Sequence, residues 1–418
     1  MLSVDEALAV VLARAEPLAA QTLPVAESVG RVLAEDIASD IDSPPYDKST
    51  VDGFAVRAAD IAGGRREFQV VEEVTAGGWP QQIVGEGQAT RIMTGAPLPS
   101  GADAVVMVEQ TEAGGWNNST SMRLTDRPVR VGQNIFRRAQ SLARGQIVLR
   151  AGQVLRPIEV GLLSEVGRAA VSVIPRPRVA VLATGDELVP PHETPGRGQI
   201  RNSNGPMLQA LAARAGGQPI DLGVARDQAD DLRERIGRGL EADLLVLSGG
   251  VSAGVLDLVP RILEEQGVER QFHQVHMRPG KPLWFGERRE SSRQTLVFGL
   301  PGNPVSSLVC WELFAKPALT RLQGLTAEPE SAEGLESSSS LTSVTGVLDA
   351  AHQQRGDRPT YWPAFAIRSR GESSLRVRLL NWQGSADLRT LTDANCLVYF
   401  PPGDRSYSQD EQVSLRWL

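Results

Sequence analysis

The sequence predicts a multidomain α/β protein built around a central parallel α/β domain. Three short apolar runs, beginning at Val179, Asp243 and Leu296, each end in a loop rich in glycine or carboxylate and precede a helical pattern. Strand and helix patterns that alternate at this length indicate parallel strands joined by right-handed crossovers. Because ligands of such sheets bind beyond the carboxyl ends of the strands, we look for the chemistry there.

Two other regions have the pattern of β structure. Residues 66–138 carry glycines and prolines every few positions between short apolar runs, which indicates a β-rich segment. Short β patterns near residues 361–367, 375–380, 394–400 and 413–418 predict a small C-terminal β-barrel or sandwich, of which we expect the barrel. Residues 326–340 are acidic and serine-rich without apolar periodicity, so we expect a linker.

The composition limits the classes of function. A chain of 418 residues implies two to four domains, and 41% hydrophobic with 22% charged residues is typical of a globular protein. A net charge of -7 argues against a nucleic-acid partner, whose binding surface would be basic. No apolar run approaches the ~20 residues of a membrane helix, and the acidic N-terminal stretch has no export pattern. We therefore expect a cytoplasmic protein with no membrane partner.

The segment before the central domain reads as a composite domain that contains an insertion. Ser3 and Glu6 have the spacing of a capping box at the start of a helix, and a second helix is expected at residues 158–167. Pro44 and Pro45 predict a stiff extended connector, and the turn at Asp52 follows it. The predicted domains are 1–43 with 139–175, the inserted β-rich domain 44–138, the α/β domain 176–325 and the barrel 341–418.

The glycine-rich loop at residues 248–254 (SGGVSAG) is a candidate anion cradle. Glycines let successive backbone N–H groups point inward, and a following helix adds its positive dipole end. The alternative is a tight structural turn. Carboxylates also gather at the strand ends, at Asp186, Glu187, Asp227 and Asp257, although Asp257 could equally be a helix cap. Beside an anion cradle they would repel the ligand unless they bind a cation or protons, and hard oxygen ligands favour magnesium.

Two proline-rich loops complete the candidate site. Residues 278–282 (RPGKP) hold two cations on a rigid loop, which reduces the entropy lost when it binds an anion. A solvated surface turn is the alternative for this loop. Residues 301–304 (PGNP) resemble a helix start, where the missing proline N–H costs nothing.

Together these motifs resemble the MoeA-type molybdenum-insertion enzymes of molybdenum-cofactor synthesis and the E domain of gephyrin. The resemblance spans nearly the whole chain. It rests on PPYDKSTVDGFAV at 44–56, IMTGAP at 92–97, GQNI at 132–135, TGDEL at 184–188, the loop at 248–254 with Asp257, PGKP at 279–282 and PGNP at 301–304. Each motif alone is weak, but their order over this length is specific.

The resemblance implies four domains, an elongated homodimer with shared active sites, and a reaction in which molybdate is inserted into adenylylated molybdopterin with release of AMP and help from Mg²⁺. A molybdopterin adenylyltransferase and acceptor apoenzymes are possible protein partners. By motif position, the implied catalytic residues are Asp52, Thr94, Glu187, Asp257 and Lys281. The implied substrate-binding residues are Ser248, Gly249, Gly250, Ser252, Gly254, Asp227, Arg278, Pro301, Pro304, Ser385 and Arg358. The implied magnesium ligands are Asp52, Asp186, Glu187 and Asp257.

Two positions depart from the family pattern. Ser141 stands where the family usually has an aspartate, and Arg278 replaces the first lysine of Lys-Pro-Gly-Lys. Arginine keeps the charge but changes its reach and shape. Two alternative functions remain: a molybdopterin adenylyltransferase, which shares the central fold but would not need the flanking domains, and a non-catalytic binding scaffold on the same fold.

Overall fold

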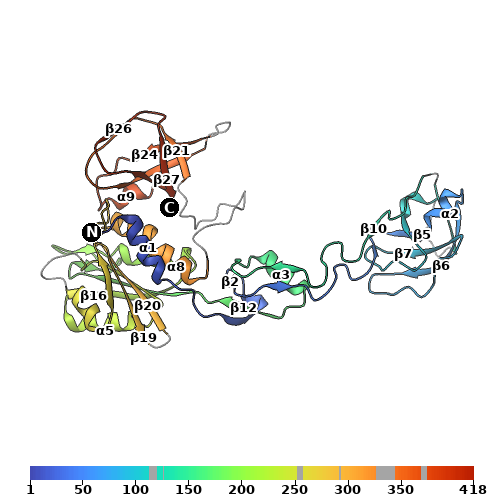
Figure 1. The fold of residues 1–418 in the computed structure, drawn as a ribbon, viewed down its shortest axis with the longest axis horizontal. Coiled ribbons are helices and arrows are strands. Elements are labelled where there is room, and N and C mark those ends of the chain that lie inside the picture. The colour runs from blue at the N-terminus through green and yellow to red at the C-terminus, as the bar shows by residue number, and fades with distance from the viewer. Residues whose placement is uncertain (113–119, 126, 252–257, 291–292, 326–343, 369–373) are drawn as a thin grey trace. The chain divides into compact units, whose positions relative to one another are not determined.

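The computed structural model describes residues 1–112, 120–125, 127–251, 258–290, 293–325, 344–368 and 374–418. The expected linker at 326–340 and the site residues Ser252, Gly254 and Asp257 lie outside these ranges. The chain divides into a larger unit (residues 1–34, 151–156 and 171–418) and a smaller unit (residues 35–150 and 157–170) (Figure 1). Each unit has its own core, and each is described separately.

A six-stranded sheet forms the centre of the larger unit, in the order β16-β13-β17-β20-β19-β18. The strands are β13 (Arg178–Thr184), β16 (Gln218–Ala225), β17 (Leu244–Ser248), β18 (Glu269–His273), β19 (Trp284–Glu290) and β20 (Arg293–Leu300). The first four strands in spatial order are parallel, as predicted. β19 is antiparallel to both of its neighbours, β20 and β18. Only two residues separate β19 from β20 in the sequence, which is too short for a crossover.

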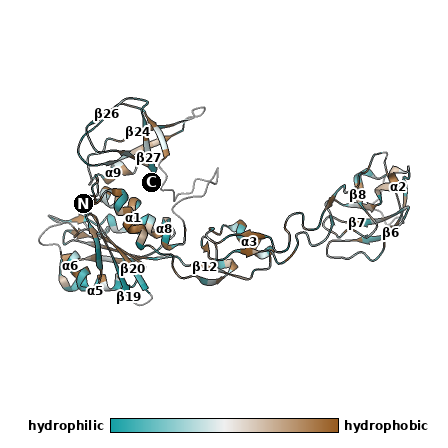
Figure 2. Cartoon of the chain, viewed as in Figure 1, coloured by the Kyte–Doolittle hydropathy of each residue, from teal (hydrophilic) through white to brown (hydrophobic). Residues whose placement is uncertain are grey.

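Helices cover both faces of this sheet. On one face lie α1 (Val4–Arg14), α4 (Asn204–Arg214), α7 (Pro304–Cys310) and α8 (Lys316–Leu322). The other face is covered by α5 (Ala229–Gly239) and α6 (Leu258–Glu265), whose outer sides are hydrophilic (Figure 2). The predicted capping box of α1 is present, with Ser3 and Glu6 bonded reciprocally. Since both faces are covered, the carboxyl edge of the parallel strands is the part of the sheet left for a ligand.

The C-terminal part of the larger unit is a closed barrel, as expected. Its strand order is β21-β24-β23-β25-β27. The strands are β21 (Val344–Leu348), β23 (Thr360–Ile367), β24 (Leu375–Leu379), β25 (Cys396–Phe400) and β27 (Gln412–Trp417). Val377, Val398 and Phe400 are fully buried inside it. An antiparallel two-stranded pair, β22 (His352–Gln354) with β26 (Arg405–Tyr407), and the short helix α9 (Leu388–Leu391) accompany the barrel.

The larger unit also contains two small sheets. The strands β1 (Gln21–Pro24), β12 (Ala170–Ile174) and β2 (Val32–Leu33) form a three-stranded sheet. After β13 the chain forms a two-stranded parallel pair, β14 (Leu188–Val189) with β15 (Ile200–Arg201). This pair places the residues around position 200 next to the loop that follows β13.

The smaller unit is β-rich, as the punctuated sequence predicted. Its five-stranded sheet has the order β8-β5-β7-β6-β9. The strands are β5 (Gly53–Val56), β6 (Glu67–Val74), β7 (Gln88–Ile92), β8 (Ala104–Met107) and β9 (Ser121–Arg123). Two-stranded pairs, β4 (Lys48–Ser49) with β10 (Ile135–Phe136) and β3 (Ile37–Ala38) with β11 (Ile147–Leu149), and the helices α2 (Ala58–Ala62) and α3 (Pro157–Glu165) complete it. In the described part of the chain, no helix has both the length and the apolar character needed to cross a membrane.

Candidate active site

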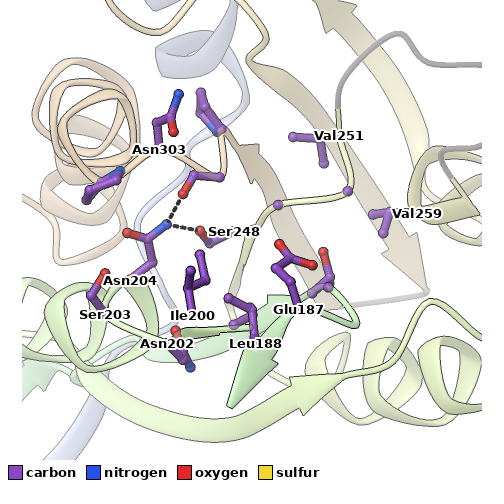
Figure 3. A pocket seen from close by; sticks show the side chains of 18 of the residues that line it. Glu187, Leu188, Ile200, Asn202, Ser203, Asn204, Ser248, Val251, Val259 and Asn303 are labelled. Atoms are coloured by element: carbon purple, nitrogen blue, oxygen red, sulfur yellow. Dashed lines mark hydrogen bonds between the residues drawn. The ribbon is translucent and has the colours of Figure 1, made fainter. Parts of the chain in front are cut away.

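A cavity of about 1010 Å³ lies at the carboxyl ends of β13, β17 and β20, where the sequence predicted the site (Figure 3). Its walls come from the loops after these three strands, from the first residues of α4 and from β15. Ala386 and Leu388, next to the barrel, close another part of the wall. Of the predicted site residues, the described lining includes Glu187, Asp227, Ser248, Gly249, Gly250, Pro301 and Pro304.

The glycine loop after β17 adopts backbone conformations that favour glycine. Gly249 has φ +94° and Gly250 has φ +63°, and both line the cavity. A Cβ atom on Gly250 would lie 2.7 Å from Oγ1 of Thr184 and 2.8 Å from Cγ2 of Val259. The loop therefore needs glycine both for its conformation and for its close packing against β13. The backbone N–H of Gly249 donates to Leu300 O over 3.1 Å, whereas that of Gly250 has no partner among the described residues.

Substitution of Gly250 by alanine should cost more than the backbone conformation alone. Gly267 offers a matched control, because it has φ +80° but no atom within 4 Å of the place that a Cβ would occupy. Both changes carry the left-handed penalty of about 1 kcal/mol, and Gly250→Ala should lose a further ~1–3 kcal/mol through overpacking. Urea unfolding of the full-length variants measures the difference. Equal losses at the two positions would show that the loop relaxes without strain.

Three carboxylates lie at neighbouring ends of β13 and β16. Glu187 and Asp227 line the cavity, and the backbone N–H of Asp227 donates to Oδ1 of Asp186 over 3.2 Å. Among the described residues, no three His, Cys, Asp or Glu side chains are grouped closely enough to hold a metal by themselves. Magnesium usually binds one or two carboxylates together with substrate phosphates and water. Glu187 and Asp227, which line the same cavity as the glycine loop, are ligands of this type.

The charged side chains of the loop at residues 278–282 do not belong to the described lining of the cavity. Lys281 and Arg278 are both exposed and absent from the described lining, whereas the neighbouring Pro282 belongs to it. The backbone of Arg278 instead joins the sheet domain to the barrel, donating to Pro359 O and accepting from Tyr361 N, each over 2.8 Å. Arg358 donates to Met277 O over 3.4 Å. These three charged side chains stay predicted site residues.

The PGNP loop links the cavity to the barrel side. Pro301 and Pro304 line the cavity, and α7 begins at Pro304. Nδ2 of Asn303 donates to Oγ of Ser385 over 2.9 Å, and Val305 N donates to Ser385 O over 3.0 Å. Ser385, which the resemblance implied, thus stands directly behind the loop that forms this wall.

The sequence analysis missed several polar lining residues, among them Thr184, Arg201, Asn202 and Asn204. Arg201 belongs to β15, and its Nε donates to Glu193 O over 3.0 Å. Thr184 and Asn204 are 3% and 7% exposed, and Oγ1 of Thr184 and Oδ1 of Asn204 have no hydrogen-bond partner among the described residues. Polar residues at a strand end and a helix start are common, so the sequence offered no signal that set these apart.

Asp52 and Thr94, both predicted, contact each other in the smaller unit. The backbone N–H and the hydroxyl of Thr94 both donate to Oδ1 of Asp52, each over 2.7 Å. The backbone N–H bond and then the hydroxyl bond lower the pKa of Asp52 below its ordinary value. Both residues are exposed, and 42 positions separate them in the chain. The pair is therefore an ionised carboxylate held in a fixed orientation at the surface.

Replacing Thr94 by valine should raise the pKa of Asp52. The change removes the hydroxyl donor but keeps the backbone donor, so the pKa should move part of the way toward its ordinary value. Because the pKa is depressed in the folded protein, the stabilisation by this contact is complete at neutral pH and is lost as the pH falls through that depressed pKa. Carboxyl ¹³C NMR titration measures the shift. Thr94→Ser is the control, and it should restore the low pKa.

Comparison with known proteins identifies two matching family profiles and several related proteins. Residues 2–167 match the family profile of the MoeA N-terminal region (domains I and II), and residues 180–321 match that of a probable molybdopterin binding domain. The chain is 34% identical to the molybdopterin molybdenumtransferase of Staphylococcus aureus (strain MRSA252) over 425 residues, covering 99% of this chain and 94% of that protein. The corresponding protein of Bacillus subtilis (strain 168) is 35% identical over 397 residues, covering 93% and 87%.

The fold agrees with these matches. A crystal structure of the molybdopterin biosynthesis MoeA protein from Pyrococcus horikoshii superposes with a TM-score of 0.80 at 30% identity, covering 100% of this chain and 99% of that one. A second structure of the protein from that organism gives a TM-score of 0.77, also at 30% identity. With relatives of this identity along nearly its whole length, the chain belongs to the MoeA family of molybdopterin molybdenumtransferases.

Proposed function

We propose that this protein inserts molybdate into adenylylated molybdopterin with release of AMP, in the cytoplasm and with magnesium. The observation that carries the proposal is the cavity at the strand ends, whose lining includes both the glycine loop and the two carboxylates Glu187 and Asp227. The loop supplies backbone N–H donors for phosphate, and the carboxylates supply ligands for a divalent cation. Adenylylated molybdopterin carries phosphate groups on a metal-binding pterin, so its binding site needs both the N–H donors and the cation ligands.

The residues of the chain divide the work between binding and positioning. Ser248 and the backbone N–H of Gly250 would bind the phosphate groups, since the N–H of Gly249 already donates to Leu300 O. Glu187 and Asp227 would hold magnesium, which when bound neutralises phosphate charge in the reaction. Asp52, which is ionised and held in orientation by Thr94, would face the site of metal insertion. Attack of water on the phosphoanhydride bond would release AMP and leave the phosphate on the molybdopterin. The two dithiolene sulfurs would replace one oxygen of molybdate, which leaves as water with the two thiol protons.

The same proposal includes a homodimer whose active sites are shared between subunits. Asp52 and Thr94 belong to the smaller unit, and the cavity belongs to the larger one. In a two-fold dimer each smaller unit could serve its partner's cavity, which would give two equivalent sites. A molybdopterin adenylyltransferase that delivers the substrate and apoenzymes that accept the product are the protein partners this reaction would need.

Incubation of the full-length protein with adenylylated molybdopterin, molybdate and magnesium tests the function. AMP should appear only when molybdate is present, and the product should activate a molybdenum-dependent apoenzyme. Substrate binding without AMP release would favour a binding scaffold instead. Formation of adenylylated molybdopterin from ATP and molybdopterin would assign the adenylyltransferase activity.

A further inference from the structure

Asp186 lies between two residues that line the cavity but does not belong to the described lining itself. Its neighbours in the loop after β13 are Gly185 and Glu187 (Figure 3), and both are part of the wall, as is Asp227 in the loop after β16. Asp186 is exposed, and among the described residues its side chain makes one hydrogen bond, in which Oδ1 accepts from the backbone N–H of Asp227 over 3.2 Å. The resemblance implied that Asp186 binds magnesium, whereas this contact ties it to the backbone of another carboxylate residue.

A second hydrogen bond joins the same two loops. Nη1 of Arg226 donates to the backbone carbonyl of Asp186 over 3.0 Å. Arg226 is itself held in place, because its backbone N–H donates to Oδ2 of Asp231 in α5 over 2.7 Å. Asp186 therefore contributes both its side chain and its carbonyl to a connection between the loops that carry Glu187 and Asp227.

The position of the Glu187 carboxylate also depends on this loop. A Cβ atom added to Gly185 would lie 2.4 Å from Oε2 and 2.7 Å from Oε1 of Glu187, so the carboxylate occupies the space that a side chain at residue 185 would fill. The backbone carbonyl of Glu187 accepts from Ile200 N over 2.8 Å on its other side. Because Asp186 directly precedes Glu187, a displacement of Asp186 would change where this carboxylate lies.

Formation of a local turn does not account for the contact of Asp186. Asp221 shows what a local contact looks like, since its Oδ1 accepts from the backbone N–H of Gly223, two positions further along the chain, over 2.8 Å. The contact of Asp186 spans 41 positions and joins the ends of two paired parallel strands. It therefore sets the distance between two loops rather than the shape of one.

We propose that Asp186 is a positioning residue and not a magnesium ligand: it sets the separation of the Glu187 and Asp227 carboxylates through its bond to the Asp227 backbone. This inference rests on the proposed function, under which Glu187 and Asp227 hold magnesium. Outer-shell groups that orient metal-binding carboxylates typically change the metal affinity by about 10- to 100-fold when they are removed. Residue 186 then needs a hydrogen-bond acceptor, but it does not need a negative charge.

Two substitutions at residue 186 separate the acceptor from the charge. Binding of Mn²⁺ alone, which prefers the same oxygen ligands as magnesium, is followed by electron paramagnetic resonance. Asp186→Asn keeps the acceptor, and it should bind Mn²⁺ within about fivefold of the wild type, because an exposed charge that does not touch the metal contributes little at about 0.15 M salt. Asp186→Ala removes the acceptor and should bind about 10- to 100-fold more weakly. Glu187→Gln, which removes a proposed ligand, should lose at least as much.

Hydrogen exchange of the peptide that contains Asp227 gives a readout that does not depend on the metal. Asp186→Ala should speed exchange of the Asp227 amide by about 2- to 10-fold, and Asp186→Asn should keep the wild-type rate. Asp221→Ala is the matched control, because Asp221 is also exposed and accepts from a backbone N–H but lies outside the described cavity lining. It should leave both the Mn²⁺ affinity and the exchange at Asp227 unchanged.

The outcomes also separate this inference from the proposed function. Equal losses of Mn²⁺ affinity in Asp186→Asn and Asp186→Ala would make Asp186 a ligand, which overturns the inference and leaves the proposed function intact. Wild-type affinity in Asp186→Ala would overturn the inference in the same way. If the wild type itself binds no Mn²⁺, the magnesium site of the proposed function is wrong, and Asp186 only joins two loops.

Discussion

Replacing Gly53 by alanine should unfold the smaller unit's sheet or leave it severely destabilised. A Cβ atom at this position would lie 1.8 Å from Val106 O and 2.8 Å from Val106 C, both backbone atoms of the paired strand β8. A flexible side chain could move aside, but a hydrogen-bonded strand cannot move without breaking its pairing. We expect a loss of more than about 3 kcal/mol, at the upper end for overpacked cores. Asp52, the preceding residue, should lose its contact with Thr94 at the same time.

A matched change in the same unit should have the opposite sign. Gly161 lies within α3, has no positive φ, and has no atom within 4 Å of the position that a Cβ would take. Gly161→Ala should therefore stabilise the unit by up to about 1 kcal/mol through helix propensity. Calorimetry of the full-length variants and hydrogen exchange at the amides of β5 and β8 measure both effects. Normal protection of these strands in Gly53→Ala would contradict the predicted clash.

Mixing two inactive variants should restore activity if the active sites are shared. Asp52→Ala damages the smaller unit's contribution, and Glu187→Ala damages the cavity. A mixed dimer would carry one doubly damaged site and one intact site. Random exchange makes about half of the dimers mixed, each with one working site of two, so activity should recover to roughly a quarter of the wild-type value.

The exchange itself needs its own control. Differently tagged subunits should co-purify after mixing, and mixing Asp52→Ala with Asp52→Ala should give no recovery. Verified exchange without any recovery would mean that each site is built within one chain. Recovery without stable exchange would point to a second route, such as transfer of an intermediate between proteins.

The sequence predicted the elements whose cause is local. The capping box of Ser3 and Glu6 and the alternation of β13, β17 and β20 with helices depend on residues close together in the chain, and both are confirmed. The position of the cavity followed from the same alternation, because parallel strands end at a common edge. The antiparallel β18 and β19 were harder to predict, since a short apolar run does not reveal the direction in which its strand pairs.

The site residues that the sequence did not predict were missed for a different reason. Asn204 is 44 residues from Ser248 and 98 from Gly302, and only the sheet topology brings these groups together. An asparagine at a helix start normally signals a cap, and here the cap is supplied by Asn202. For Lys281 the motif gave the charge, but the placement of its side chain relative to the cavity depends on packing that no local pattern records.

The wall contributed by Ala386 and Leu388 has a consequence for how the protein is made. Translation produces the sheet and the glycine loop first, and the residues that finish the wall emerge only after most of the barrel strands have been synthesised. A nascent chain, or one shortened before residue 386, would lack the part of the cavity wall that Ala386 and Leu388 form.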